Sequence, residues 1–331
     1  MRSPESVAEN GLLAMGTDIG LLFQPLELRD YTLPNRIVMP PMVSNRPIVS
    51  EDGLHWYADR AAGGVGLVIV ESTAVGRVVR ELTIEALRKL VDAIHEHGAL
   101  AAIQLYPMTD RAAPAWDAKP ADLDVAQLRE LVAEYEAAAH VCAEAGFDGA
   151  EPHGAHGFLL NQFFSPADNK RTDRYGGQLK NRMRMGLEIA RAVRRGLGPR
   201  RLVLYRHTPV QDGSYGLEDS LSFAENLVNE GVDILDISPA SAQTPGDLAQ
   251  PFRRLNAPVI AVGMMDQVDR AVEVLARGRA DLVAIGRGLI ADPLWPRKVR
   301  AGQFDKVLRC IRDDKCFAAL REGNAVECSQ W

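Results

Sequence analysis

The sequence contains no apolar run near the eighteen or so residues that a membrane-spanning helix requires. It also lacks a cleavage site of the secretory kind, and its N-terminal stretch combines a weak apolar segment with acidic neighbours. Without an export signal, the four cysteines are interpreted as thiols or former ligands and not as disulfides; they are Cys142, Cys310, Cys316 and Cys328. We therefore expect a cytoplasmic protein without a membrane partner.

The sequence has no excess of positive charge, because its formal net charge is −6. This balance disfavours non-specific binding to nucleic acid, although a local basic patch stays open. With 47% hydrophobic and 25% charged residues, the composition is ordinary for a soluble globular enzyme. At 331 residues the chain can bury a large core, so it needs no disulfide or metal to stabilise it.

Short apolar, β-branched runs alternate with longer amphipathic stretches along the chain. Such runs suit strands buried on both faces, as in parallel sheets covered by helices. The eight candidate strands are 36–42, 66–72, 99–105, 147–152, 201–206, 233–238, 257–262 and 280–286. Helical spacing predicts helices over 84–97, 124–145, 179–196, 218–230 and 267–277. Asp124 is a start signal and Gly278 a stop signal.

Eight strands alternating with helices predict a closed barrel or a doubly wound sheet. No G-x-G-x-x-G follows the first strand, as a dinucleotide-binding sheet would be expected to show. We therefore predict a single (β/α)8 TIM barrel over 19–302, with an N-terminal capping hairpin within 19–34. Residues 1–18 are predicted to be a loosely ordered leader, and residues 303–331 a C-terminal tail.

In such barrels the working residues lie at the C-terminal ends of the strands and in the loops that follow. The phosphate site of many barrels lies after strands seven and eight, where this sequence has Gly263 and then Gly286 and Arg287. Glycine lets backbone N–H groups approach phosphate oxygens, and an arginine fork pairs with them. Taken singly, the glycines could instead serve turns and Arg287 could be a surface residue.

His153 and His156 follow the fourth strand, three residues apart. A metal pair or two incidental loop histidines are alternatives, but no acidic or cysteine partner for a metal lies at suitable spacing, so we expect no metal. Two imidazoles at a barrel mouth can hydrogen-bond one oxygen of a carbonyl or phenol and hold an oxyanion. Gln104 and Arg206 end apolar strands, where an unsatisfied polar group is costly. A heteroaromatic ring would satisfy both, and beside a flavin Arg206 would stabilise negative charge on the reduced ring.

From about residue 21 to 300 the chain resembles the old yellow enzyme family of FMN-dependent oxidoreductases. The most specific run is FDGAEPHGAHGFLLNQFFSPADNKRTDRYGG. The other matching runs are LFQPLELRDYTLPNRIVMPPM, YADRAAGGVGLVIVEST, VIAVG and ADLVAIGRGLIADP.

The resemblance implies a bound FMN and a role for each matching position. Pro40, Pro41, Met42, Val43 and Ser72 would line the flavin, Gln104 its pyrimidine side and Arg206 its N1 region. Gly263, Gly286 and Arg287 would hold the phosphate, and His153 and His156 the substrate's oxygen. NAD(P)H would reduce FMN, and flavin N5 would pass hydride to the activated C=C of a conjugated carbonyl or similar compound. The substrate would then be a small molecule. The resemblance does not fix the oligomeric state, so a monomer and a homo-oligomer both stay open.

The chain departs from the family pattern where a tyrosine usually donates a proton. Phe158 stands there and has no ionisable proton, so Tyr106 and Tyr57 are the candidates to replace it. One alternative is that Phe158 only fills space while water protonates, since general acid catalysis contributes only part of the rate. The other is a family member that desaturates a substrate or isomerises it without net redox change. A flavin- or phosphate-binding barrel with little catalysis is the remaining alternative.

Cys310, Cys316 and Cys328 fall where longer relatives carry a four-cysteine iron–sulfur motif. Asp313 takes the place of the second cysteine, and the spacing is altered. Three thiolates would need an unusual fourth ligand, so the tail is expected to hold relict cysteines and no cluster.

Overall fold

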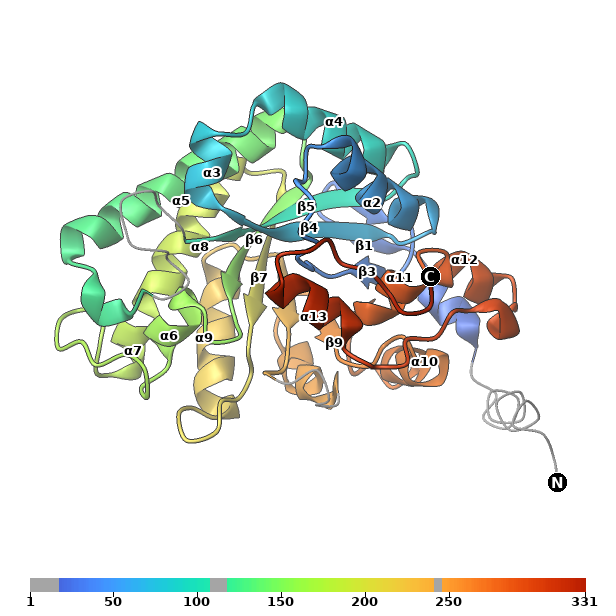
Figure 1. The fold of residues 1–331 in the computed structure, drawn as a ribbon. Helices are drawn as coiled ribbons and strands as arrows, with labels where there is room; N and C mark the ends of the chain where they lie inside the picture. Colours follow the sequence, from blue (N-terminus) through green and yellow to red (C-terminus); the bar gives the residue numbers. More distant parts are fainter. Residues whose placement is uncertain (1–17, 108–117, 241–245) are drawn as a thin grey trace.

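The structure is a computed structural model that describes residues 18–107, 118–240 and 246–331. Eight parallel strands close into a barrel in the order β10-β3-β4-β5-β6-β7-β8-β9, and helices surround it (Figure 1). The strands are β3 (Ile37–Met39), β4 (Leu67–Ala74), β5 (Leu100–Tyr106), β6 (Gly149–Gly154), β7 (Leu202–His207), β8 (Ile234–Ile237), β9 (Val259–Val262) and β10 (Leu282–Ala284). All eight coincide with predicted strands, which confirms the barrel and excludes the doubly wound sheet.

A two-stranded hairpin closes one end of the barrel. It consists of β1 (Leu26–Leu28) and β2 (Tyr31–Leu33), which pair antiparallel after the 3₁₀ turn η1 (Ile19–Phe23). Leu33 is fully buried in the same cluster as the inward-facing strand residues. The hairpin therefore forms the floor of the barrel, as predicted. The predicted leader, residues 1–18, lies outside the described residues except for Asp18.

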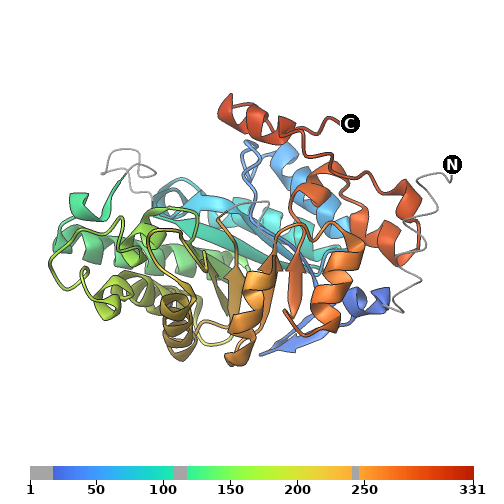
Figure 2. The same ribbon diagram turned by 90° about the horizontal axis from the view of Figure 1, so that it is seen from below.

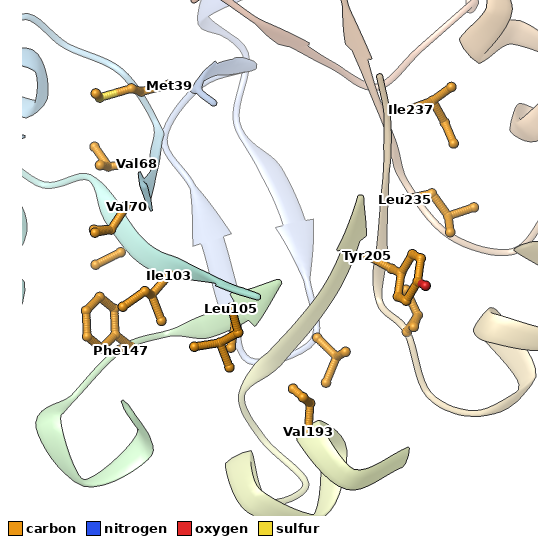
Figure 3. Close-up of a cluster of buried hydrophobic side chains, with 14 of the residues drawn as sticks. Met39, Val68, Val70, Ile103, Leu105, Phe147, Val193, Tyr205, Leu235 and Ile237 are labelled. Carbon is orange, nitrogen blue, oxygen red and sulfur yellow. The ribbon is translucent and has the colours of Figure 1, made fainter. Parts of the chain in front are cut away.

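Side chains alternate between the two faces of each strand, and this alternation divides the core into two apolar layers. The inner layer fills the lower part of the barrel with residues such as Ile69, Leu204 and Ile260. The outer layer packs the strands against the helices; Figure 3 shows part of it, with Val68, Val70, Ile103, Leu105, Tyr205, Leu235 and Ile237 labelled. Because successive strand residues face opposite sides, the residue two places after an inner apolar residue again points into the barrel.

The predicted helices are present as α4 (Ile84–His95), α5 (Val125–Ala145), α7 (Leu179–Arg182), α8 (Arg184–Leu197), α9 (Leu217–Asn229) and α10 (Val268–Ala276). Asp124 caps α5 by accepting from the Gln127 amide at 2.8 Å, which confirms the start signal. Gly278 follows α10 at a φ of 60°, as a stop signal requires. One prediction is corrected: the helix expected over 179–196 is interrupted at Met183.

Other elements had no prediction. They are α2 (Glu51–Ala62), α3 (Val75–Arg80), α6 (Leu159–Phe164), α11 (Arg287–Ala291), α12 (Trp295–Arg300), α13 (Lys315–Arg321) and the 3₁₀ turns η2 (Pro120–Asp122), η3 (Gly246–Arg254) and η4 (Phe304–Lys306). Across the described residues, no helix combines the length and apolar character that a bilayer crossing would need.

The C-terminal segment 303–331 lies against the loop that follows β3. The Val326 amide donates to the Ser44 carbonyl at 2.9 Å, and the Asn45 side chain donates to the Asn324 carbonyl at 2.9 Å. Figure 2 shows this segment, in red, as an arm that ends beside α2 (Glu51–Ala62). Because that loop follows the C-terminal end of a strand, the arm borders the end of the barrel where barrel enzymes carry their sites.

Candidate active site

Above the inner apolar layer, the barrel carries a layer of polar and charged side chains. Gln104 on β5, Glu151 on β6, Arg206 on β7 and Asp236 on β8 each lie two residues beyond an inward-facing residue of their own strand. The strand pairing places Gln104 opposite Glu151 and Arg206 opposite Asp236. All four are buried, with at most 6% of their surface exposed. The sequence therefore builds a charged layer toward the functional end of the barrel.

Both polar atoms of the Gln104 side chain are already paired inside the protein. Its Nε2 donates to Glu151 Oε1 at 2.8 Å, and its Oε1 accepts a hydrogen bond from the Ser72 hydroxyl. The prediction that the Gln104 amide needs a ligand for its hydrogen bonds is therefore wrong, because Glu151 and Ser72 already supply its partners. Its place at the flavin stays a prediction.

Arg206 keeps unused hydrogen-bonding capacity. One of its terminal nitrogens, NH2, donates to Ser238 Oγ at 3.1 Å, and its Nε lies 3.4 Å from Asp236 Oδ2. That ion pair is too poorly aligned for a hydrogen bond, so Nε has no hydrogen-bond partner among the described residues. A buried donor without a partner is costly, which fits a site that binds an acceptor.

His153 and His156 come together as predicted from their spacing. Their ring centroids are 5.5 Å apart and nearly perpendicular. His153 ends β6 beside Arg206 and is buried, whereas His156 is more exposed and its Nε2 lies 2.8 Å from Ser238 Oγ. Burial, the other imidazole and Arg206 hold the pKa of His153 well below its usual range. Burial and Arg206 also lower the pKa of His156, to about 3. Both imidazoles are therefore neutral at pH 7 and can donate N–H hydrogen bonds without carrying charge.

His156 adopts a backbone conformation that is rare for a residue other than glycine. Its φ is 58°, and its amide donates to Thr208 Oγ1 at 2.9 Å. Such a conformation costs free energy and persists only where neighbouring groups hold it. The loop after β6 is thus built to hold the His156 ring at the barrel mouth.

Phe158, at the position of the usual proton donor, and the two candidate donors Tyr57 and Tyr106 occupy different environments. Phe158 lies against His153, with ring centroids 4.5 Å apart. Tyr57 is fully buried, and its hydroxyl donates to Glu71 Oε2 at 3.2 Å. Tyr106 ends β5 and is half-buried, and burial is the main reason that its pKa is raised. Of the two tyrosines, only Tyr106 is partly exposed. The segment 108–117, which follows shortly after Tyr106, lies outside the described residues.

The predicted phosphate residues lie side by side after β9 and β10, which are adjacent in the barrel. Gly263 has a φ of 117°, a conformation that side chains rarely adopt. A Cβ at Gly286 would lie 3.4 Å from Met42 Sδ, so glycine leaves room between the two loops. The Arg287 guanidinium is directed to the C-terminal arm, where it donates to Asp314 Oδ1 at 3.0 Å. Sequence reasoning gave no sign of this contact.

Solvent exposure increases along the first residues of the loop after β3. Pro40 is buried, Pro41 and Met42 are half-buried, and Val43 is exposed. Ser72, on β4, is half-buried, and its hydroxyl contacts Gln104 on the neighbouring strand β5. These residues lie at the same end of the barrel as the histidines. Their contact with a flavin stays a prediction.

Sequence reasoning missed the acidic members of the charged layer. Glu151 lies in the run GAEPHG and Asp236 in ILDI, each a single charge within an apolar strand. A single charge in a strand buried on both faces was a usable signal. What the sequence could not show was that both carboxyl groups face Arg206 from different strands.

The cysteines of the C-terminal arm are free thiols. Cys310, Cys316 and Cys328 are all half-buried. Within residues 18–107, 118–240 and 246–331, no three His, Cys, Asp or Glu side chains are grouped so as to hold a metal ion.

Comparison with known proteins places the chain in a family. Residues 21–306 match the model of the NADH:flavin oxidoreductase / NADH oxidase family. An NADPH dehydrogenase of Listeria innocua is 36% identical, over 84% of this chain and 93% of that protein. An NADH oxidase of Thermoanaerobacter brockii is 32% identical over 88% of this chain, which spans only 52% of that longer relative.

A solved structure agrees with these sequence matches. Morphinone reductase in complex with tetrahydroNAD is 28% identical, with a TM-score of 0.71 over 85% of this chain and 90% of that one. Together with the barrel and the position of the histidine pair, these matches confirm the resemblance seen in the sequence. The chain belongs to the NADH:flavin oxidoreductase / NADH oxidase family, also known as the old yellow enzyme family, and is an NAD(P)H-dependent flavin oxidoreductase.

Proposed function

We propose that this protein binds FMN at the mouth of the barrel and uses NAD(P)H to reduce an activated C=C bond of a small conjugated carbonyl compound. The observation that carries the proposal is the neutral imidazole pair, with His153 and His156 held 5.5 Å apart beside a buried guanidinium. Two neutral donors on one oxygen stabilise the negative charge that develops when hydride adds to the conjugated carbon. When bound, FMN supplies the hydride chemistry that amino-acid side chains lack.

The residues present fit FMN. Arg206 Nε has no hydrogen-bond partner among the described residues, and its positive charge suits the electron-rich N1–C2 region of the flavin. Gln104 and Ser72, together with Pro40, Pro41, Met42 and Val43, would line the ring. Gly263, Gly286 and Arg287 would hold the phosphate. Arg287 has only 13% of its side chain exposed and is already oriented by Asp314, which limits the entropy lost when it binds an anion.

His153 and His156 contribute binding and orientation. The His153 Nδ1 faces the Ala155 amide at 3.4 Å, which favours the tautomer with the proton on Nε2. His156 Nε2 contacts Ser238, so a substrate oxygen would compete with this hydroxyl for the imidazole. Because both rings are neutral, the pair stabilises an enolate oxygen through hydrogen bonds and does not transfer a proton to it outright.

A second candidate function is favoured by Phe158. Its ring packs on His153 at the place where relatives carry a donor tyrosine, and it has no proton to give. If no other group protonates the substrate promptly, the same site would desaturate a saturated ketone or isomerise an enone. Tyr106 and water are the remaining proton sources for the reductive reaction.

An anaerobic titration tests the proposal. NADPH should bleach the flavin absorbance of the purified protein, and cyclohexenone should restore it with formation of the saturated ketone. Bleaching followed by an isomerised product, or oxidation of a saturated ketone in air, would favour the second function. Absence of bleaching by both NADH and NADPH in a protein that contains FMN would contradict the reductive function and favour the second function or a barrel with little catalysis.

A further inference from the structure

The charged layer contains two carboxyl groups and only one guanidinium. Glu151 and Asp236 are both fully buried, and Arg206 has 6% of its surface exposed. They project into the barrel from three consecutive strands, β6, β7 and β8. Neither carboxyl group has a role in the proposed reaction, so the cost of burying them needs an explanation.

The two carboxyl groups have different partners. Asp236 faces Arg206 across the β7–β8 pair, with Oδ2 3.4 Å from Nε. Glu151 makes no ion pair with any residue that the structure describes; its Oε1 accepts from Gln104 Nε2 at 2.8 Å. Its other oxygen, Oε2, has no hydrogen-bond partner among the described residues, and neither has either oxygen of Asp236. What distinguishes the two carboxyl groups is therefore the ion pair, which only Asp236 makes with Arg206.

The surroundings of the two groups indicate where a proton resides. The guanidinium of Arg206 on β7 is the positive charge that acts on both carboxyl groups. His153, two residues beyond Glu151 on β6, is a neutral imidazole. Burial raises the pKa of Glu151 well above its usual value and the negative charge of Asp236 raises it further, against the opposing effects of Arg206 and of the hydrogen bond from Gln104. Burial also raises the pKa of Asp236, but Arg206, which lies within ion-pair distance of it, opposes that rise and no negative charge adds to it. One positive charge can balance one carboxylate, so the second carboxyl group keeps its proton.

We propose that Asp236 is the permanent counter-ion of Arg206 and that Glu151 is a neutral carboxylic acid. The layer then has no net charge, and this balance limits how strongly Arg206 favours the reduced flavin over the oxidised flavin. The inference rests on the proposed FMN site. Both acids are positioning residues: Glu151 orients the Gln104 amide by accepting from its Nε2, and Asp236 offsets the guanidinium charge.

Replacing each acid by its amide should therefore have different effects on the charge of the layer. Glu151→Gln replaces a neutral group by a neutral group of similar shape, so it leaves the electrostatics of the layer unchanged. Asp236→Asn removes the charge that offsets Arg206, and the anionic reduced flavin then gains from an uncompensated guanidinium. Because loss of Asp236 also makes ionisation of Glu151 easier, the clean comparison is Glu151→Gln with and without Asp236→Asn.

The first experiment measures the flavin midpoint potential of the FMN-loaded protein at pH 7. Glu151→Gln should change the ratio of affinities for reduced and oxidised FMN by less than about threefold. Adding Asp236→Asn should raise that ratio at least tenfold, which equals 29.6 mV for a two-electron couple. A large shift in Glu151→Gln alone, or no shift in the double variant, would overturn the inference.

The second experiment does not need FMN, and it keeps the inference testable if the double variant fails to fold. The infrared spectrum of the flavin-free protein at pH 7 should contain the carbonyl stretch of a protonated, buried carboxylic acid, and Glu151→Gln should remove it. A spectrum without this band, or a band that survives in Glu151→Gln, would overturn the assignment of the proton. A protein that shows the band but refuses FMN would contradict the proposed function and leave the proton on Glu151.

Discussion

Phe158 and His153 lie in direct ring contact, with centroids 4.5 Å apart and planes tilted by 45°. The contact puts a side chain without an ionisable proton next to an imidazole that would bind the substrate. A proton donor must therefore come from elsewhere in the site, or the reaction does not end in protonation.

Phe158→Tyr should place a phenol hydroxyl beside the imidazole pair. If protonation limits ene reduction, the rate of flavin reoxidation by cyclohexenone should rise by about tenfold or more, because general acids contribute roughly 10²–10⁴-fold. Stopped-flow absorbance measures the rate, and Phe158→Leu controls for packing. Equal rates in all three proteins would show that another group or water already supplies the proton.

The imidazole pair should determine the binding of phenols. His153→Ala combined with His156→Ala should abolish the long-wavelength charge-transfer band that a bound phenol gives with oxidised FMN. His140→Ala, a change at an exposed position of α5, is the matched control and should retain the band. A band of unchanged intensity in the double variant would exclude the proposed role of the pair.

The barrel could be predicted from the sequence because each buried strand is a short apolar run that needs no knowledge of its neighbours. The floor hairpin has a different local signal, because Leu26, Leu28 and Leu33 alternate with polar residues in the segment before the first barrel strand. The roles of Glu151 and Asp236 were not predictable, because their environment depends on which strands pair and in what register. The contact between Arg287 and Asp314 joins segments 27 residues apart, and no local pattern indicates it.

The floor hairpin should contribute strongly to stability. Leu33→Ala should lower the free energy of unfolding by about 2–5 kcal/mol, because Leu33 is fully buried in the inner layer of the barrel. Chemical denaturation measures the change. Thr32→Ala, at the exposed neighbouring position, should cost much less; similar losses for both would mean that the hairpin does not close the core as described.

The proton on Glu151 should make stability depend on pH. Because the folded protein holds this proton above the ordinary pKa of 4.5, it binds more protons than the unfolded chain does as pH rises past that value. The wild-type protein should therefore lose stability relative to Glu151→Gln as pH rises from about 4.5 toward neutrality. Glu85→Gln on the exposed face of α4 is the control and should run parallel to the wild type. Parallel curves for Glu151→Gln would contradict the retained proton.

Arg287 should distinguish FMN from riboflavin, which lacks the phosphate. Arg287→Ala should weaken FMN binding about tenfold or more, since a charge-assisted hydrogen bond contributes roughly 1.5–3 kcal/mol. Riboflavin binding, followed by fluorescence quenching, should change little. If both ligands weaken equally, Arg287 supports the fold of the arm through Asp314 and does not bind phosphate.

The most direct test is the flavin content of the folded protein itself. The purified protein should be yellow, or become yellow when FMN is added, and should retain about one FMN per chain after gel filtration. A folded protein that stays colourless and binds no added FMN would contradict the account, whatever the agreement of its barrel with flavin-binding relatives.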